Sequence, residues 1–253
     1  MSEYDTFRRR KASDLSRFAT ALRNSRLSCD VGGFNSASAD CQSNPPNGSD
    51  SWGYSLSGVR LIDPAEQKHV RPSGATLSEL VLNVVLEGKC VPTNQRKQDP
   101  LTRLGVEIKI LGVNAEGQKI RSSWYMDRHS AASPMKTPVH PTYHFQFGGI
   151  QSKQAETGNM IVASAPRVAH PPLDAVLAID FALSNFFHEE WIELRTDKGQ
   201  YYSVVKDTQR WLWMPYVKAS DKGWDRVGLQ HPWQVVEVWP QLIPEEGLGP
   251  LHD

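Results

Sequence analysis

The sequence predicts an α+β fold, in which an antiparallel β-meander or curved sheet packs against a buried central helix and a second, C-terminal helix. The middle of the chain contains several segments in which apolar and polar residues alternate, as is typical of half-buried strands. A nearly all-apolar helical pattern and then an aromatic-rich one follow these segments. We therefore expect a basic helix at residues 1–27, a flexible linker or loop at 28–53 that tethers it, and a single domain at 54–253.

The N-terminal helix is predicted from apolar residues that recur every three or four positions, with Lys11 in the gap on that face. These apolar residues are Tyr4, Phe7, Leu15, Phe18 and Leu22. The polar side carries the consecutive arginines Arg8, Arg9 and Arg10. They are candidates for contact with a protein partner, and only this helix offers nucleic acid a basic surface. A face that meets solvent alone is the alternative.

The linker is predicted from composition. Residues 28–53 are rich in Ser, Asn, Gly, Asp and Pro and contain little to bury, which is typical of a flexible connection.

The strands of the predicted meander are separated by short polar segments. They are expected at residues 54–62, 77–86, 104–110 and 119–126. The third is the clearest, because Leu104, Val106 and Ile108 alternate with glycine and charged residues. Asn114 to Gly117 is typical of the hairpin turn that follows it.

A further strand is expected within residues 139–149, which hold the densest group of histidines and aromatic residues. In an extended chain Tyr143 and Phe145 point to one face and His144 to the other, which should be polar. At roughly 3.3 Å per residue, His140 and His144 would lie about 13 Å apart, too far to share one metal directly. A divalent metal there would need another ligand, such as His170, and no other cofactor is predicted.

The central helix is expected to begin at Pro171 or Pro172 and to be buried, because apolar residues surround nearly its whole circumference. Its polar exceptions are Asp180, Ser184 and His188, one turn apart. Their order does not suit a catalytic triad, which needs the histidine between the serine and the acid, so a buried hydrogen-bonded chain is the preferred interpretation.

The second helix is expected from residue 200 to about 213. Pro215 should end it.

Composition excludes several classes of protein. Lys plus Arg and Asp plus Glu are equal at 28 each, so no net charge draws the chain to nucleic acid or to an anionic membrane. The sequence contains neither an apolar run long enough to span a bilayer nor a signal segment, which predicts a cytoplasmic protein. The cysteines Cys29, Cys41 and Cys90 form no C-x-x-C pair and should be free thiols.

Two functions of different class fit these features. The preferred one is a non-enzymatic protein-binding or scaffolding subunit of a larger assembly. Its contacts would come from the basic helix and from Trp224, Trp233 and Trp239 in the irregular C-terminal region, which otherwise wrap the core. The alternative is a hydrolase or lyase centred on His140 and His144, with Asp180 and His188 in support and a metal as an option.

The order of the predicted elements is similar to the layout of ubiquitin-conjugating enzymes and their inactive variants. The similarity covers about residues 54–213 and includes an extended segment with His140 and Pro141. No cysteine follows that segment in the sequence. The resemblance therefore implies a catalytically inactive, binding-type relative and no thioester-forming enzyme.

Overall fold

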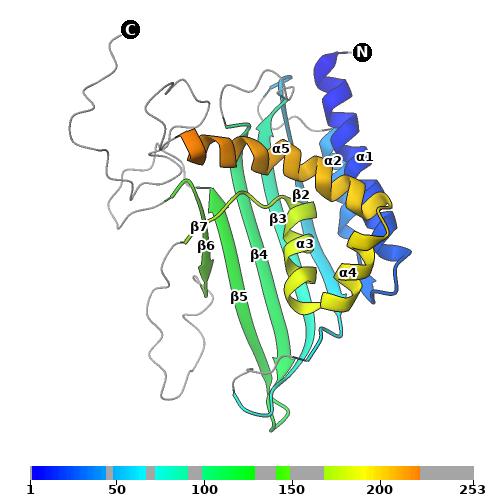
Figure 1. Ribbon diagram of the computed structural model, residues 1–253, viewed down its shortest axis with the longest axis vertical. Helices are drawn as coiled ribbons and strands as arrows, with labels where there is room; N and C mark the ends of the chain where they lie inside the picture. The colour runs from blue at the N-terminus through cyan, green and yellow to red at the C-terminus, as the bar shows by residue number, and fades with distance from the viewer. Residues whose placement is uncertain are drawn as a thin grey trace, which may run out of the picture.

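The α+β fold is confirmed by the computed structural model (Figure 1), which describes residues 2–43, 48–66, 72–90, 99–128, 141–148 and 168–222. The helices are α1 (Glu3–Arg23), α2 (Gly33–Ser43), α3 (Ala175–Phe186), α4 (His188–Thr196) and α5 (Gln200–Lys222). The strands are β1 (Cys29–Asp30), β2 (Ser51–Ile62), β3 (Thr76–Lys89), β4 (Leu101–Val113), β5 (Lys119–Arg128), β6 (Tyr143–Phe147) and β7 (Val168–Ala169).

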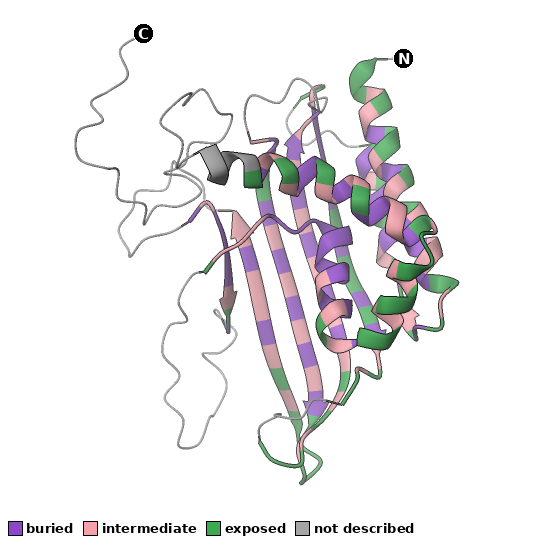
Figure 2. Cartoon of the chain, in the orientation of Figure 1, coloured by how far each residue is buried: buried purple, intermediate pink, exposed green. Residues whose placement is uncertain are grey.

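The sheet is an antiparallel meander in which each strand pairs with its neighbours in the sequence, from β1 to β7. Side chains alternate between its two faces, so buried and half-buried residues alternate along β3 and β4 (Figure 2). Leu82 and Ile108, which pair across these strands, are fully buried, whereas the next pair, Asn83 and Glu107, lies on the half-exposed face. The helices cover the buried face, and the core lies between them and the sheet.

The sequence predicted that the first helix would be joined to the domain only by a flexible tether. Helix α1 instead packs into the core. A capping box begins the helix, because Ser2 Oγ accepts from the Asp5 N–H at 3.1 Å and the Asp5 carboxylate accepts from the Ser2 N–H at 3.2 Å. Further along, the fully buried Phe18 ring lies 5.0 Å from that of Tyr201 on α5 and 5.8 Å from that of Phe34 on α2. The first helix thus joins the second and the last.

The prediction of a flexible linker or loop at residues 28–53 is wrong. This range contains β1, α2 and the start of β2, and α2 packs between α1 and β2. The buried residues of α2 are Phe34, Ala37, Ser38 and Cys41. Ser38 Oγ accepts from Ser16 Oγ and donates to the Ala12 carbonyl, both at 3.0 Å. Small side chains let two helices approach closely, and a composition poor in large apolar residues therefore does not exclude a buried helix.

The predicted central helix is two helices. Asp174, and neither Pro171 nor Pro172, precedes its first turn, and its carboxylate accepts a hydrogen bond from the Leu177 N–H at 2.9 Å. Phe187 has φ −140° and ψ 55°, which ends α3 and lets α4 start in a new direction. Eight residues of α3 are buried, Asp180 among them, whereas none of α4 is buried. The expected burial is therefore correct for the first half of the segment and wrong for the second.

Pro215 lies inside α5 and does not end it, contrary to the prediction. Proline removes one intrahelical hydrogen bond, but Trp211, Leu212 and Tyr216 on either side of it are buried against the core. This packing against the core keeps α5 continuous across Pro215.

Gly88 lies near the end of β3, paired with Leu101 at the start of β4, at a point where a side chain has no room. A Cβ atom there would lie 2.5 Å from the Pro100 carbonyl oxygen and 3.1 Å from Trp52 Nε1. We expect Gly88→Ala to lower the free energy of unfolding by about 1–3 kcal/mol in urea denaturation. Gly105→Ala is the control, because its nearest contact would be 3.9 Å away. An equal loss in both variants would show that the close backbone approach is not the cause.

Candidate functional site

A groove of about 400 Å³ lies between α1 and α5. Its floor is aromatic: the Phe7 ring lies 6.3 Å from that of Trp211, and both pack on Trp52, at 5.4 and 5.5 Å. Trp211 and Trp52 are buried, so the floor is part of the hydrophobic core. Contact between three rings makes it rigid.

The walls of the groove carry charges of both signs. On α1 they are Glu3, Arg10, Lys11 and Asp14, and on α5 they are Asp207 and Arg210. The Lys11 ammonium lies 4.0 Å from the centre of the Trp211 ring, a close cation–π contact.

Two arginines on the groove walls have no polar contact with the rest of the described chain. Arg10 and Arg210 are exposed, one on each wall, and neither forms an ion pair or hydrogen bond within the described residues. Asp14 differs from them: it is half-buried, and its only described ion pair is a long one to Arg17, 3.7 Å away. Burial raises the pKa of Asp14, although Lys11 acts to lower it.

The sequence indicated only one wall of this groove. Arg10 belongs to the predicted basic face, and Lys11 was visible as a lysine in an apolar stripe. Nothing local connects them with Arg210 and Trp211, which the packing of α5 on α1 brings to the same place.

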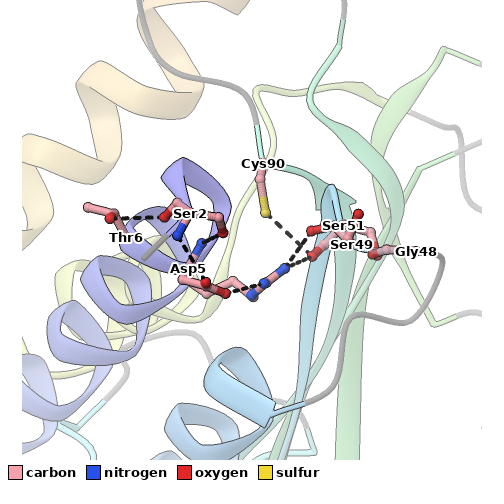
Figure 3. Close-up of polar contacts among 8 residues, drawn as sticks. Ser2, Asp5, Thr6, Gly48, Ser49, Ser51 and Cys90 are labelled. Carbon is pink, nitrogen blue, oxygen red and sulfur yellow. Dashed lines mark hydrogen bonds and ion pairs between the residues drawn. The ribbon is translucent and has the colours of Figure 1, made fainter.

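Arg8 does not belong to the exposed basic face, and its prediction as a surface contact is wrong. It is only 8% exposed. Its guanidinium donates to the carbonyls of Ser49 and Ser51 at 2.8 and 3.1 Å and to the Asp5 carboxylate at 2.6 Å, in the cluster drawn in Figure 3. Cys90 Sγ donates to the same Ser51 carbonyl at 3.4 Å (Figure 3). Arg8 therefore fastens α1 to the start of β2, while Arg9 and Arg10 remain exposed.

The predicted histidine site is not assembled by the described residues. His140 lies outside them. His144 is buried, although the alternation along β6 predicted a polar face for it, and its Nδ1 lies 3.3 Å from the Pro141 carbonyl oxygen. The His170 ring packs 5.6 Å from that of Phe145, which alternates with His144 along the strand, so the two imidazoles are on opposite faces of the sheet.

His170 is held locally. Its Nδ1 lies 2.6 Å from the Pro171 carbonyl oxygen, and burial lowers its pKa. No group of three or more His, Cys, Asp or Glu side chains in the described ranges is arranged to bind a metal.

Asp180 and His188 are separated by the break at Phe187. Asp180 is buried and accepts four hydrogen bonds: from Trp191 Nε1 at 2.9 Å, from Arg195 at 3.0 and 2.7 Å, and from the Tyr201 hydroxyl at 2.8 Å. His188 is exposed and stacks on Trp191, 6.2 Å between ring centres.

The expected hydrogen-bonded chain from Asp180 through Ser184 is not formed, because Ser184 donates to the Phe181 carbonyl at 2.9 Å. Asp180 instead joins α3, α4 and α5.

A second buried polar cluster was missed by the sequence analysis. The Asp99 carboxylate accepts from Arg128 Nε at 2.9 Å, from the Tyr143 hydroxyl at 2.9 and 2.8 Å, and from the Leu101 N–H at 3.0 Å. Burial raises the pKa of Asp99 in spite of the adjacent guanidinium. The cluster joins the ends of β4, β5 and β6. Its residues are far apart in the sequence and belong to no recognisable motif.

The three tryptophans predicted as partner contacts, Trp224, Trp233 and Trp239, lie outside the described residues.

The cysteines Cys29, Cys41 and Cys90 are free thiols, as expected. Burial raises the pKa of Cys41 to about 12 and that of Cys90 to about 11. At neutral pH neither buried thiol is a nucleophilic thiolate.

Comparison with known proteins finds no matching family model, no matching curated protein and no matching solved structure. Within the described part of the chain, none of the helices has both the length and the apolar character that crossing a membrane requires.

Proposed function

We propose that the protein is a non-enzymatic protein-binding or scaffolding subunit that holds a segment of a partner polypeptide in the α1–α5 groove. The observation that carries the proposal is the combination of a rigid aromatic floor, Phe7 and Trp211, with the guanidinium groups of Arg10 and Arg210 on opposite walls, which have no ion pair or hydrogen bond within the described residues. Protein interfaces are enriched in tryptophan and arginine, with an apolar centre inside a polar rim.

The proposal includes a cytoplasmic location. The three free cysteines support it, because paired cysteines are usual in oxidising compartments.

The catalytic alternative stays a prediction. His140 lies outside the described residues, and no observation on His144, Asp180 or His188 favours it. The binding-type similarity to ubiquitin-conjugating enzymes likewise stays a prediction.

The groove is tested by site-specific photo-crosslinking in cells. A photoreactive residue at Thr6, on the groove, is expected to form an adduct with a partner, whereas the same residue at Arg103, exposed on the opposite face of the sheet, should not. Mass spectrometry identifies the adduct. Equal labelling of one protein from both positions would contradict the assignment of this site.

Measuring the affinity of the identified partner for variants of the protein then tests the roles of Arg10 and Arg210 in binding. Arg10→Glu with Arg210→Glu should weaken binding by about tenfold or more, because each guanidinium would lose a contact and gain repulsion. Arg9→Glu with Lys206→Glu is the matched control, since it makes the same change of charge on the same helices, away from the groove. Equal weakening in both pairs would show a general charge effect, and the groove would then not be the binding site.

A further inference from the structure

The exposed side of α1 carries arginines and no acid (Figure 2). These residues are Arg9, Arg17 and Arg23, which we call the arginine stripe. Arg9 and Arg23 are exposed, and the Arg17 side chain is 40% exposed. From residue 6 to residue 24 the one acid in the sequence is Asp14, which lines the α1–α5 groove instead. This side of α1 therefore has a local positive potential, which the zero net charge of the chain conceals.

The guanidinium groups of the arginine stripe bind little within the protein. Arg9 forms no ion pair or hydrogen bond with the described residues. Arg17 has a long ion pair of 3.7 Å, and Arg23 donates to a threonine hydroxyl at 3.4 Å. In contrast, Arg8 is bound to buried carbonyls, and Arg26 pairs with two carboxylates of α4 at 2.9 and 3.6 Å. The stripe thus keeps its charge available to an external anion.

Helix α2 widens this surface without adding an acid to it. The two helices lie side by side (Figure 1), and Ser16 Oγ donates to Ser38 Oγ across them at 3.0 Å. The charged residue of α2 is Asp40, whose carboxylate accepts from the Ser55 N–H on β2 at 3.2 Å. The exposed side chains of α2 are Asn35, Ser36, Ala39, Gln42 and Ser43. Arginines, hydroxyls and amides are among the groups that contact nucleic-acid phosphates.

We propose that the arginine stripe and the adjoining side of α2 bind the phosphate backbone of double-stranded nucleic acid. Arg9 and Arg23 are separated by about 21 Å at the rise of an α-helix, which spans about six phosphates of one strand. Contacts to phosphates carry no sequence information, so binding should depend on salt and not on base sequence. The stripe lies outside the groove between α1 and α5, and it acts whether or not the groove binds a partner.

The composition of the surface favours a duplex over other anions. Single strands are held by exposed aromatic side chains on which bases stack, but Phe18 and Phe34, where α1 and α2 meet, are buried. Anionic membranes take up an amphipathic helix through its apolar side, and that side of α1 is packed in the core. A duplex offers one charge per about 1.7 Å, a density that an acidic peptide does not reach.

Fluorescence anisotropy tests the surface, with the whole chain and a labelled DNA duplex of about 20 base pairs, and with an RNA duplex of the same sequence. Both duplexes should bind at about 50 mM salt, with a slope of log affinity against log salt near −3, about one phosphate for each arginine of the stripe. Arg9→Glu with Arg17→Glu should weaken binding at least about tenfold. Lys119→Glu with Lys206→Glu is the matched control, because it makes the same change of charge at exposed positions away from α1 and α2, and it should weaken binding less than about twofold.

A milder pair of variants keeps the proposal testable if charge reversal disturbs α1. Arg9→Gln with Arg17→Gln retains good helix formers and should reduce the magnitude of the salt slope by about two, with an unchanged circular dichroism spectrum. The proposal would be overturned if neither duplex binds, or if the control pair weakens binding as much as the stripe variants. Tighter binding of a thymidine single strand, of polyglutamate or of phosphatidylserine vesicles would overturn it as well.

Discussion

Asp180→Ala is expected to lower the free energy of unfolding by about 3–5 kcal/mol. The buried carboxylate accepts hydrogen bonds from Trp191, Arg195 and Tyr201, and its removal leaves a largely buried guanidinium without its charge partner. The Tyr201 hydroxyl, on a side chain only 2% exposed, would lose its acceptor as well. Urea denaturation followed by far-ultraviolet circular dichroism measures the loss.

The control is Asp197→Ala, an exposed aspartate at the end of α4. It should change the stability by less than about 0.5 kcal/mol. Asp180→Asn should fall between the two, because the amide oxygen still accepts but no longer neutralises Arg195. A small effect of Asp180→Ala would mean that α4 and α5 are held by apolar packing and not by this carboxylate.

Arg128→Met is expected to lower the free energy of unfolding by about 3 kcal/mol at neutral pH, because it leaves Asp99 buried without a cation. Burial already raises the pKa of Asp99, and loss of the guanidinium should raise it further. A native carboxyl with a raised pKa keeps its proton where the unfolded chain has lost it, so stability falls as pH rises. The deficit of the variant should therefore be larger at about pH 7 than at about pH 4.

The ion pair between Arg128 and Asp99 is tested by a second substitution that should restore the lost stability. Asp99→Asn in the Arg128→Met background removes the unpaired charge and should recover more than half of the lost stability at neutral pH. Denaturation of the single and double variants at both pH values gives the comparison. A deficit of Arg128→Met that is independent of pH, with no recovery in the double variant, would assign the loss to packing of the arginine stem.

The strands were predictable because their signal is local. Leu104, Val106 and Ile108 alternate with polar residues, and that pattern alone places one face of β4 in the core. Helix α2 was missed because Phe34 is its one large apolar side chain, and its burial depends on the close approach of α1. The break at Phe187 was missed for a similar reason, since the residue is apolar and suits a continuous helix.

The candidate site was predictable only in part. Arg10 stands in a visible basic run, but its counterpart Arg210 is 200 positions away, and their approach depends on how α5 crosses the core. Burial decided the other candidates: Arg8 and His144 look like surface residues in the sequence, and each is covered by elements that are distant in the chain. A single sequence carries little information on such contacts.

The order of the strands has a consequence for how the chain folds during synthesis. Because every strand pairs with its neighbour in sequence, β2 to β5 can form hairpin by hairpin as they leave the ribosome. The seam between α1 and α5 cannot close until the chain has been made past residue 211. Until then Phe7, Phe18 and Trp52 lack their partners on α5, and the nascent protein exposes an aromatic surface that invites chaperones or aggregation.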